Sequence, residues 1–393
     1  MRHESRRMEA VQASHIPAVA ALLHQYPDTI TLGQGVMHYG PPPEVRVALG
    51  RFFEDPSSHK YKPEIGIKPL IDALTCKLET ESEFQILPES RIVVTAGSNM
   101  AFLNAILAIA DPGDEIIVPV PFYFNHEMTI TMAGARPVFV PADGDYQLRL
   151  DAIKAAITPR TRAILTVSPN NPTGVVYPQA ALRAVNELCR QRGIYHISDE
   201  AYEYFTYGSA AHFSPGSIPG SAEHTISLFT LSKTYGFASW RIGYMVIPEH
   251  LLEAVRKIQE TNIICPPVIS QFAALGALEA GAAFRAPKIA EMAATREIVL
   301  GELESVRDFC DTSPSDGAIY VFLRLHSSLL PMILVERLVR EQGVAVLPGS
   351  DFGMMEGCSL RISYGALPRQ MAAEGVGRLV RGLAAIVKEG EAA

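Results

Sequence analysis

The stretch "RIVVTAGSNMAFLNAILAIADPGDEIIVPV", residues 91–120, contains a strand, a helix and a second strand in succession. Residues 91–95 and 115–120 are short apolar runs typical of strands, and 99–110 is typical of a helix. The "DPGD" sequence before the second strand predicts a turn. A strand, helix and strand in this order predict two parallel strands of one sheet.

The same alternation continues to about residue 260. Strand-like and helix-like segments follow one another at 135–140, 151–157, 162–167, 179–192, 194–198 and 225–229. We therefore predict an α/β fold with an open, mostly parallel central sheet and helices on both faces. Short strands within a helix-rich sequence near the C-terminus predict a smaller α+β domain. We expect a large domain at 51–285 and a small domain at 1–50 and 286–393.

Composition favours a globular protein that acts on small molecules. The 393 residues are 48% hydrophobic and 19% charged, which predicts a soluble chain with a sizeable core. The net charge of −8 and the scattered basic residues give no reason to expect nucleic acid or a membrane as a partner. The five cysteines lie far apart, so we expect no metal site and a cytoplasmic location. No apolar run approaches the roughly 20 residues of a membrane span.

Polar residues follow four of the predicted strands directly. They occur in "AGSN" (96–99), "SPNNPTG" (168–174), "SDEAY" (198–202) and "TLSK" (230–233). Because ligands of parallel sheets bind beyond the carboxyl ends of the strands, we expect these segments to meet in one crevice.

One end of this crevice is predicted to bind a phosphate. A glycine-containing turn that opens a helix presents backbone N–H groups to an anion, although alone it also fits an ordinary capped helix. Hydroxyl groups and a guanidinium nearby strengthen the phosphate interpretation. The residues expected there are Gly97, Ser98, Asn99, Thr230, Ser232 and Arg241.

Lys233 is the candidate nucleophile of the crevice. A lysine in an apolar crevice has a lowered pKa and forms a Schiff base readily, whereas a structural lysine at a strand end is the alternative. Asp199, at the end of a buried strand, needs a cationic partner such as the protonated pyridine of pyridoxal phosphate. Tyr202 and Asn171 are placed to hydrogen-bond the cofactor's phenolic oxygen. The alternatives are a helix cap for Asp199 and a core aromatic for Tyr202.

Three motifs together resemble class I/II aminotransferases of pyridoxal-phosphate fold type I. They are "SPNNPTG" (168–174), "SDEAYEYF" (198–205) and "SKTYGFASWRIGY" (232–244), and the similarity runs through nearly the whole chain in order. The resemblance implies that Lys233 holds pyridoxal phosphate and moves a proton between the substrate's α-carbon and the cofactor. It also implies that Asp199 and Tyr202 are catalytic residues together with Lys233.

The resemblance also implies further cofactor contacts. Tyr61 would reach across a homodimer to the phosphate in the neighbouring subunit. Tyr123 would stack on the pyridine ring, as aromatic rings favour. His126 would orient Asp199 from behind, although a solvent-facing helix histidine is the alternative.

On the substrate side, the resemblance implies that Arg361 binds the α-carboxylate in a fork. Gly35 would line that side of the pocket together with Asn171. The Asn171–Pro172 peptide bond is expected to be cis, a conformation that X–Pro bonds adopt at small cost.

The substrate side chain is predicted to be aromatic or large and apolar. Residues 259–271 lack the arginine by which one subclass binds dicarboxylates, and residues 36–39 and 263–267 are mostly apolar or aromatic. Several motifs also resemble plant aminotransferases that pass the amino group of methionine to aromatic 2-oxo acids. His38 remains a candidate ligand for a polar or carboxylate side chain.

We therefore predict a ping-pong aminotransferase that acts on phenylalanine, tyrosine, tryptophan or methionine and a 2-oxo acid. The alternatives are an aminotransferase for aspartate or another dicarboxylate, and a C–S β-lyase built from the same parts. A regulator that joins such a domain to a DNA-binding domain is disfavoured, because only about 30 residues precede the first family-like segment.

Overall fold

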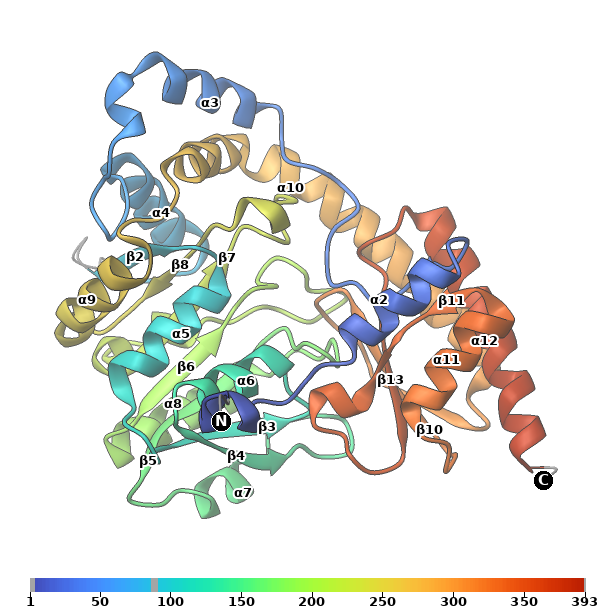
Figure 1. The fold of residues 1–393 in the computed structure, drawn as a ribbon. Coiled ribbons are helices and arrows are strands. Elements are labelled where there is room, and N and C mark those ends of the chain that lie inside the picture. Colours follow the sequence, from blue (N-terminus) through green and yellow to red (C-terminus); the bar gives the residue numbers. More distant parts are fainter. Residues whose placement is uncertain (1–3, 86–90, 392–393) are drawn as a thin grey trace.

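The structure is a computed structural model that describes residues 4–85 and 91–391 (Figure 1). Within these residues the central sheet has seven strands, in the order β2-β8-β7-β6-β5-β3-β4. All neighbours are parallel except β8, which runs antiparallel to β2 and to β7. The prediction of a mostly parallel sheet is thus confirmed. The strands are β2 (Ile92–Thr95), β3 (Glu115–Val120), β4 (Arg136–Pro141), β5 (Thr161–Val167), β6 (Tyr195–Asp199), β7 (Thr225–Thr230) and β8 (Gly243–Val246).

Helices cover both faces of the central sheet. Successive residues of a strand point to opposite faces, and these strands are apolar on both, so each face needs a covering layer. In β3, Ile116 and Val118 pack in one core cluster with residues of α5, α6 and α9. Ile117 lies between them and packs in another cluster with α7 and α8. The helices are α5 (Ser98–Ile109), α6 (Phe124–Met132), α7 (Leu150–Ala155), α8 (Gln179–Arg192) and α9 (Leu252–Ile263).

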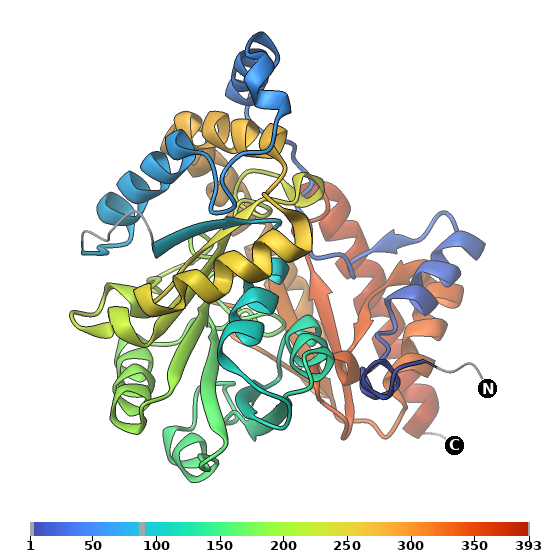
Figure 2. The same ribbon diagram turned by 60° about the vertical axis from the view of Figure 1, so that its left-hand side comes forward.

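A second, antiparallel sheet lies to one side of the first, in the orange-to-red part of Figure 2. Its strand order is β12-β13-β10-β9, and the short strand β1 pairs separately with β11. The helices α2, α11 and α12 pack around this part. The elements are α2 (Ile16–Gln25), β1 (Ile30–Thr31), β9 (Cys310–Thr312), β10 (Tyr320–Leu325), α11 (Pro331–Gln342), β11 (Val344–Ala345), β12 (Leu347–Pro348), β13 (Cys358–Ser363) and α12 (Arg369–Glu391).

The long helix α10 (Val268–Leu303) runs between the two parts (Figure 1). It is kinked at Gly281, whose φ of 53° lies outside the helical region. The helices α3 (Glu44–Glu54) and α4 (Lys68–Glu81) pack against it, and α1 (Arg6–Ala10) packs on α6. The segment 1–50 therefore contributes to both parts of the molecule, and the predicted domain boundaries stay a prediction.

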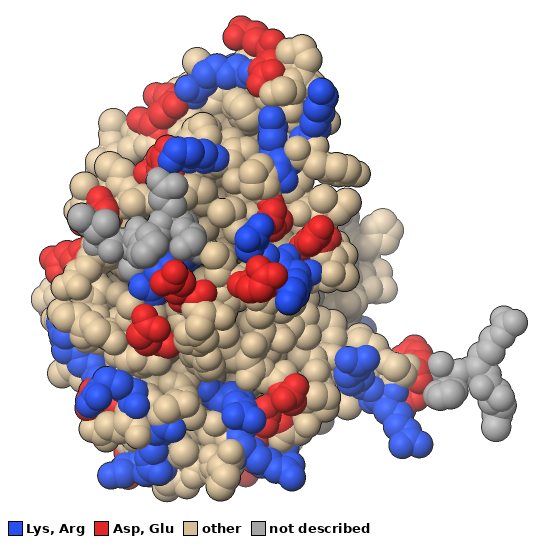
Figure 3. All heavy atoms as spheres, turned by 90° about the vertical axis from the view of Figure 1, so that its left-hand side faces the viewer, with Lys and Arg blue, Asp and Glu red and all other residues tan. Residues whose placement is uncertain are grey.

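Figure 3 shows the face of the molecule that lies on the left in Figure 1. Positively and negatively charged side chains are interspersed on this face. Among the described residues, no group of three or more His, Cys, Asp or Glu side chains is arranged to hold a metal ion. No single described helix has the length and apolar composition to cross a membrane. One pair bent by 118°, Glu249–Ile263 with Val268–Val306, meets those criteria only when its two helices are taken together.

Candidate active site

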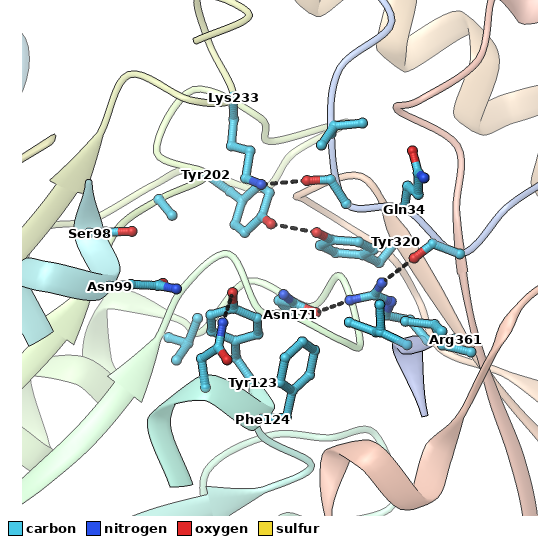
Figure 4. A pocket seen from close by; sticks show the side chains of 18 of the residues that line it. Gln34, Ser98, Asn99, Tyr123, Phe124, Asn171, Tyr202, Lys233, Tyr320 and Arg361 are labelled. Carbon is cyan, nitrogen blue, oxygen red and sulfur yellow. Dashed lines mark hydrogen bonds between the residues drawn. The ribbon is translucent and has the colours of Figure 1, made fainter. Parts of the chain in front are cut away.

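A cavity of about 510 Å³ lies where the carboxyl ends of the central strands meet the second sheet (Figure 4). Polar residues after β2, β5, β6 and β7 converge there, as predicted from the four motifs. The predicted site residues that line it are Gly35, Ser98, Asn99, Tyr123, Asn171, Asp199, Tyr202, Lys233 and Arg361.

Lys233 stands three residues beyond β7 and points into the cavity (Figure 4). Its Nζ donates a hydrogen bond to the carbonyl oxygen of Gly35 at 2.5 Å and lies 5.6 Å from the centre of the Tyr202 ring. Burial lowers the pKa of the Lys233 amine, which favours its neutral, nucleophilic form. The Tyr39 hydroxyl donates to the Lys233 carbonyl oxygen at 3.1 Å and so supports the backbone at this position.

Asp199 is the last residue of β6 and is buried. Its Oδ2 lies 3.0 Å from Nε2 of His126, and its Oδ1 accepts a hydrogen bond from the Ala201 amide at 3.1 Å. His126 comes from α6 and is only 3% exposed, so it is not a solvent-facing histidine. The carboxylate is therefore held in one orientation at the floor of the cavity.

The start of α5 has the features predicted for an anion site. Gly97 precedes this helix with φ 83°, and no side chain caps the helix. A Cβ at Gly97 would lie 2.4 Å from Nη2 of Arg241, so only glycine allows the guanidinium to pack against this terminus. Thr230 pairs with Gly243, two residues after Arg241, and its Oγ1 donates to Oγ of Ser232 at 2.9 Å. A helix N-terminus, a guanidinium and two hydroxyls together suit a phosphate.

Arg361 lies at the other end of the cavity, on β13, and is buried. Its Nη1 donates to Oδ1 of Asn171 at 3.0 Å, and its Nη2 donates to the carbonyl oxygen of Gly33 at 2.6 Å. The Nε of Arg361 is buried without a hydrogen-bond partner. A guanidinium has five N–H donors, so Arg361 retains free donors for a carboxylate.

Some predicted residues lie outside this cavity. The Tyr61 side chain is 78% exposed and does not line it. His38 does not line it either, because its Nε2 points to Glu291 at 3.1 Å. Val36 lines the cavity, whereas residues 37–39 and 263–267 do not. The Asn171–Pro172 bond is cis, as predicted.

Sequence reasoning missed Tyr320 and one face of α2. Tyr320 lines the cavity, but the surrounding "AIYVFLRL" looks like an ordinary buried strand. The α2 residues that line the cavity follow a helical spacing that predicts a buried face without showing what that face covers. These residues are Ile16, Val19, Ala20 and Leu23.

The residues present fit pyridoxal phosphate. This cofactor carries a phosphate, a basic ring nitrogen and an aldehyde. The α5 terminus with Arg241, the buried Asp199 carboxylate and the Lys233 amine match these three groups in turn. Tyr123, on the cavity wall, is the aromatic ring expected to stack on the pyridine, and its Oη accepts a hydrogen bond from Asn125 at 2.6 Å.

Comparisons with known proteins agree with this geometry. The family model for aminotransferase class I and II matches residues 27–379. A probable aspartate/prephenate aminotransferase of Aquifex aeolicus is 35% identical over 91% of each chain. The aromatic aminotransferase ISS1 of Arabidopsis thaliana is 30% identical over 98% of each chain.

Solved structures show the same similarity. A single mutant of the Thermus thermophilus aspartate aminotransferase superposes with a TM-score of 0.90 at 32% identity, over 97% of this chain and 100% of that one. The aromatic aminotransferase from Pyrococcus horikoshii superposes with a TM-score of 0.86 at 30% identity, over 94% of this chain and 99% of that one.

Proposed function

Because this chain belongs to the class I and II aminotransferases, which use pyridoxal phosphate, we propose that its amino donors are L-amino acids with aromatic or large apolar side chains. Phenylalanine, tyrosine, tryptophan and methionine are the expected donors. The observation that supports this choice is the apolar lining of the cavity beyond the reactive groups.

Within the described residues, the lining contains two cationic side chains, Lys233 and Arg361, and one carboxylate, Asp199. Arg361 is expected to bind the α-carboxylate and Lys233 the cofactor. The described residues therefore supply no further cation to the cavity for a second, distal carboxylate. Most of the wall is apolar or aromatic, including Phe124, Tyr320 and Leu347. Such a wall favours a large uncharged side chain.

The residues divide the reaction between them. Bound pyridoxal phosphate supplies the electron sink that makes the α-proton acidic. Arg361 orients the amino acid through its carboxylate, with Nε and the free Nη protons as donors. The neutral Nζ of Lys233 would accept the proton from the substrate's α-carbon and deliver a proton to the cofactor's C4′ carbon. Asp199, which His126 holds in place, would keep a proton on the cofactor's ring nitrogen, and Tyr202 and Asn171 would supply hydrogen bonds to its phenolic oxygen.

A dicarboxylate donor such as aspartate is the second candidate. Several relatives have aspartate in their names, including those of Aquifex aeolicus and Pyrococcus abyssi. This activity would need a cation that the described lining of this chain does not supply. A C–S β-lyase is the third candidate, and its products differ from those of amino transfer.

One experiment separates the three candidates. The holoenzyme is mixed with L-phenylalanine, L-methionine, L-aspartate or a cysteine conjugate, without any 2-oxo acid, and the oxo acid, ammonia and pyruvate formed are measured. We expect one equivalent of oxo acid per site, with the second-order rate constant of this half-reaction at least tenfold higher for phenylalanine and methionine than for aspartate. Faster conversion of aspartate would overturn the substrate class. Continuous release of pyruvate and ammonia would indicate a lyase.

We also propose that the protein is a homodimer in which Tyr61 completes the partner's site. Exposed apolar side chains gather on α3 and the segments beside it. Val47 is 67% exposed and Phe53 63%, and Tyr61 follows at 78%. The helix α3 packs on α10, which carries the exposed Ile269. Exposed apolar side chains grouped in this way are typical of a protein interface.

The dimer proposal predicts a specific effect of Tyr61→Phe. We expect the wild-type protein to sediment as a dimer in analytical ultracentrifugation. We expect Tyr61→Phe to lose cofactor faster than the wild type on dialysis, because the substitution removes one contact with the phosphate. Tyr26→Phe is the matched control, since Tyr26 is also exposed and lies outside the cavity lining. A monomeric wild-type protein, or unchanged cofactor retention in Tyr61→Phe, would contradict the proposal.

A further inference from the structure

Tyr320 lines the cavity, and its side chain lies between those of Tyr202 and Arg361 (Figure 4). It is the first residue of β10 and is only 1% exposed. Its hydroxyl lies 2.6 Å from the hydroxyl of Tyr202, which lies in the turn that follows β6 of the central sheet. The two rings meet edge to face, with centroids 5.5 Å apart and planes at 78°.

The ring of Tyr320 also contacts the carboxylate-binding arginine. The Cζ of Arg361 lies 4.5 Å from the centre of the Tyr320 ring and 4.7 Å from that of Phe352. Strands β10 and β13 pair with Phe322 opposite Arg361, so Tyr320 and the arginine share one rigid ladder. A guanidinium over an aromatic face is attracted to it and loses rotational freedom.

A third contact explains why residue 35 is glycine. A Cβ at Gly35 would lie 2.3 Å from the hydroxyl oxygen of Tyr320. With glycine, the chain passes this hydroxyl, and the Gly35 carbonyl oxygen remains free to accept the bond from Nζ of Lys233. Tyr320 therefore touches Tyr202, Arg361 and the segment that holds the Lys233 amine.

The hydrogen bond between the two tyrosines has a definite direction once the site is in use. Each hydroxyl has one proton to donate. Burial raises the pKa of Tyr202 well above its usual value, so that its hydroxyl keeps its proton. When Tyr202 donates this proton to the phenolic oxygen of the cofactor, its remaining lone pairs accept from Tyr320. A hydroxyl that accepts a hydrogen bond becomes a stronger donor.

We propose that Tyr320 is a positioning residue for two functional side chains of the site. It donates a hydrogen bond to the Tyr202 hydroxyl, and it holds the Arg361 guanidinium against its ring. The inference rests on the roles expected for Tyr202 and Arg361 in the aminotransferase reaction. It does not depend on which side chain the substrate carries.

The first test is a pH titration of the visible absorption band of the holoenzyme, without substrate. A donor at the phenolic oxygen favours loss of the proton from the nitrogen that joins Lys233 to the cofactor. Tyr320→Phe weakens this donor, so we expect the titration midpoint to rise by about half to one pH unit. Tyr320→Gln keeps an N–H donor and should shift the midpoint less.

Tyr207→Phe is the matched control for this test. It removes a buried tyrosine hydroxyl that donates to the Ala318 carbonyl oxygen at 2.7 Å, outside the cavity lining. Its midpoint should equal that of the wild type. An unshifted midpoint in Tyr320→Phe, or an equal shift in Tyr207→Phe, would overturn the proposal.

A double-mutant cycle tests whether the two hydroxyls act together. Tyr202→Phe should shift the midpoint in the same direction as Tyr320→Phe. Adding Tyr320→Phe to Tyr202→Phe should then have almost no further effect, because the hydroxyl that relays the hydrogen bond is already absent. Additive shifts would contradict the coupling.

The contact with Arg361 is tested by Tyr320→Leu, which removes the ring. We expect KM for the amino donor to rise about tenfold relative to Tyr320→Phe, with a smaller change in kcat. Because both variants are assayed with the same donor, a wrong assumption about the substrate class would lower both activities and leave their ratio informative. Equal KM values for the two variants would show that the ring does not hold the arginine.

Discussion

Single residues decide whether this molecule can catalyse amino transfer. We expect Lys233→Ala to lower kcat at least a thousandfold, because the amine both holds the cofactor and carries the proton. Steady-state assays against Lys257→Ala check this, since Lys257 is exposed on α9 and does not line the cavity. Comparable activity of the two variants would rule out the role of Lys233.

At the same scale, Arg361→Lys tests the carboxylate site. Lysine keeps the charge but lacks the forked, planar donors that also reach Asn171 and the Gly33 carbonyl. We expect KM for the amino donor to rise about ten- to hundredfold, with a smaller change in kcat. Initial rates over a range of donor concentrations measure this split. An unchanged KM would place the carboxylate elsewhere.

The reactive residues could be predicted from the sequence because they occur in short motifs. Asp199 ends a strand, and Lys233 and Asn171 lie in the loops just after two other strands, positions that meet at one sheet edge. Tyr320 could not be predicted in this way, since its neighbours in sequence are core residues. His38 shows the reverse problem: its chemistry suits a ligand, but the fold turns it toward Glu291.

At the scale of elements, a buried polar network joins α8 to strands β5, β6 and β7. His196 lies fully buried between Thr166 and Asn186, at 2.8 and 3.2 Å. Burial lowers the pKa of His196 to about 3, so the folded state keeps it neutral. The unfolded chain binds a proton below about pH 6.5, and the stability gained from this site is therefore lost as the pH falls from about 6.5 toward 3.

This network predicts the pH dependence of unfolding. From His196 alone, the free energy of unfolding should fall by up to about 1.4 kcal/mol per pH unit in that window. Urea denaturation between pH 7.5 and 4.5 measures the slope. His196→Gln should reduce it, whereas His24→Gln, on the exposed side of α2, should not. The same slope in both variants would contradict the assignment.

The helix α2 predicts an effect on substrate size. Ala20 lines the cavity, whereas Ala21 beside it does not. We expect Ala20→Trp to lower kcat/KM for L-phenylalanine at least tenfold more than for L-alanine, because the larger side chain fills space that the aromatic donor needs. Ala21→Trp is the control of equal size and should treat both donors as the wild type does. Equal losses for both donors in Ala20→Trp would contradict the prediction.

At the scale of the whole molecule, the layers of the fold could be predicted from the sequence better than the contacts between segments that are far apart in the chain. The hydrophobic period and the turn residues located the parallel strands within one or two residues, as at 115–120 and 162–167. The antiparallel β8 was not predicted, because it follows β7 through the loop at 231–242, which contains a short 3-10 helix in place of a crossover α-helix. The position of α2 over the cavity depends on packing against α11, which no local pattern specifies.

Reduction of the purified holoenzyme with borohydride, followed by proteolysis and mass spectrometry, tests the central claim most directly. Borohydride reduces the double bond between the cofactor and its lysine to a stable single bond. We predict one cofactor-derived mass per chain, on the peptide that contains Lys233. Attachment to another lysine, or none at all, would contradict the site described for this protein.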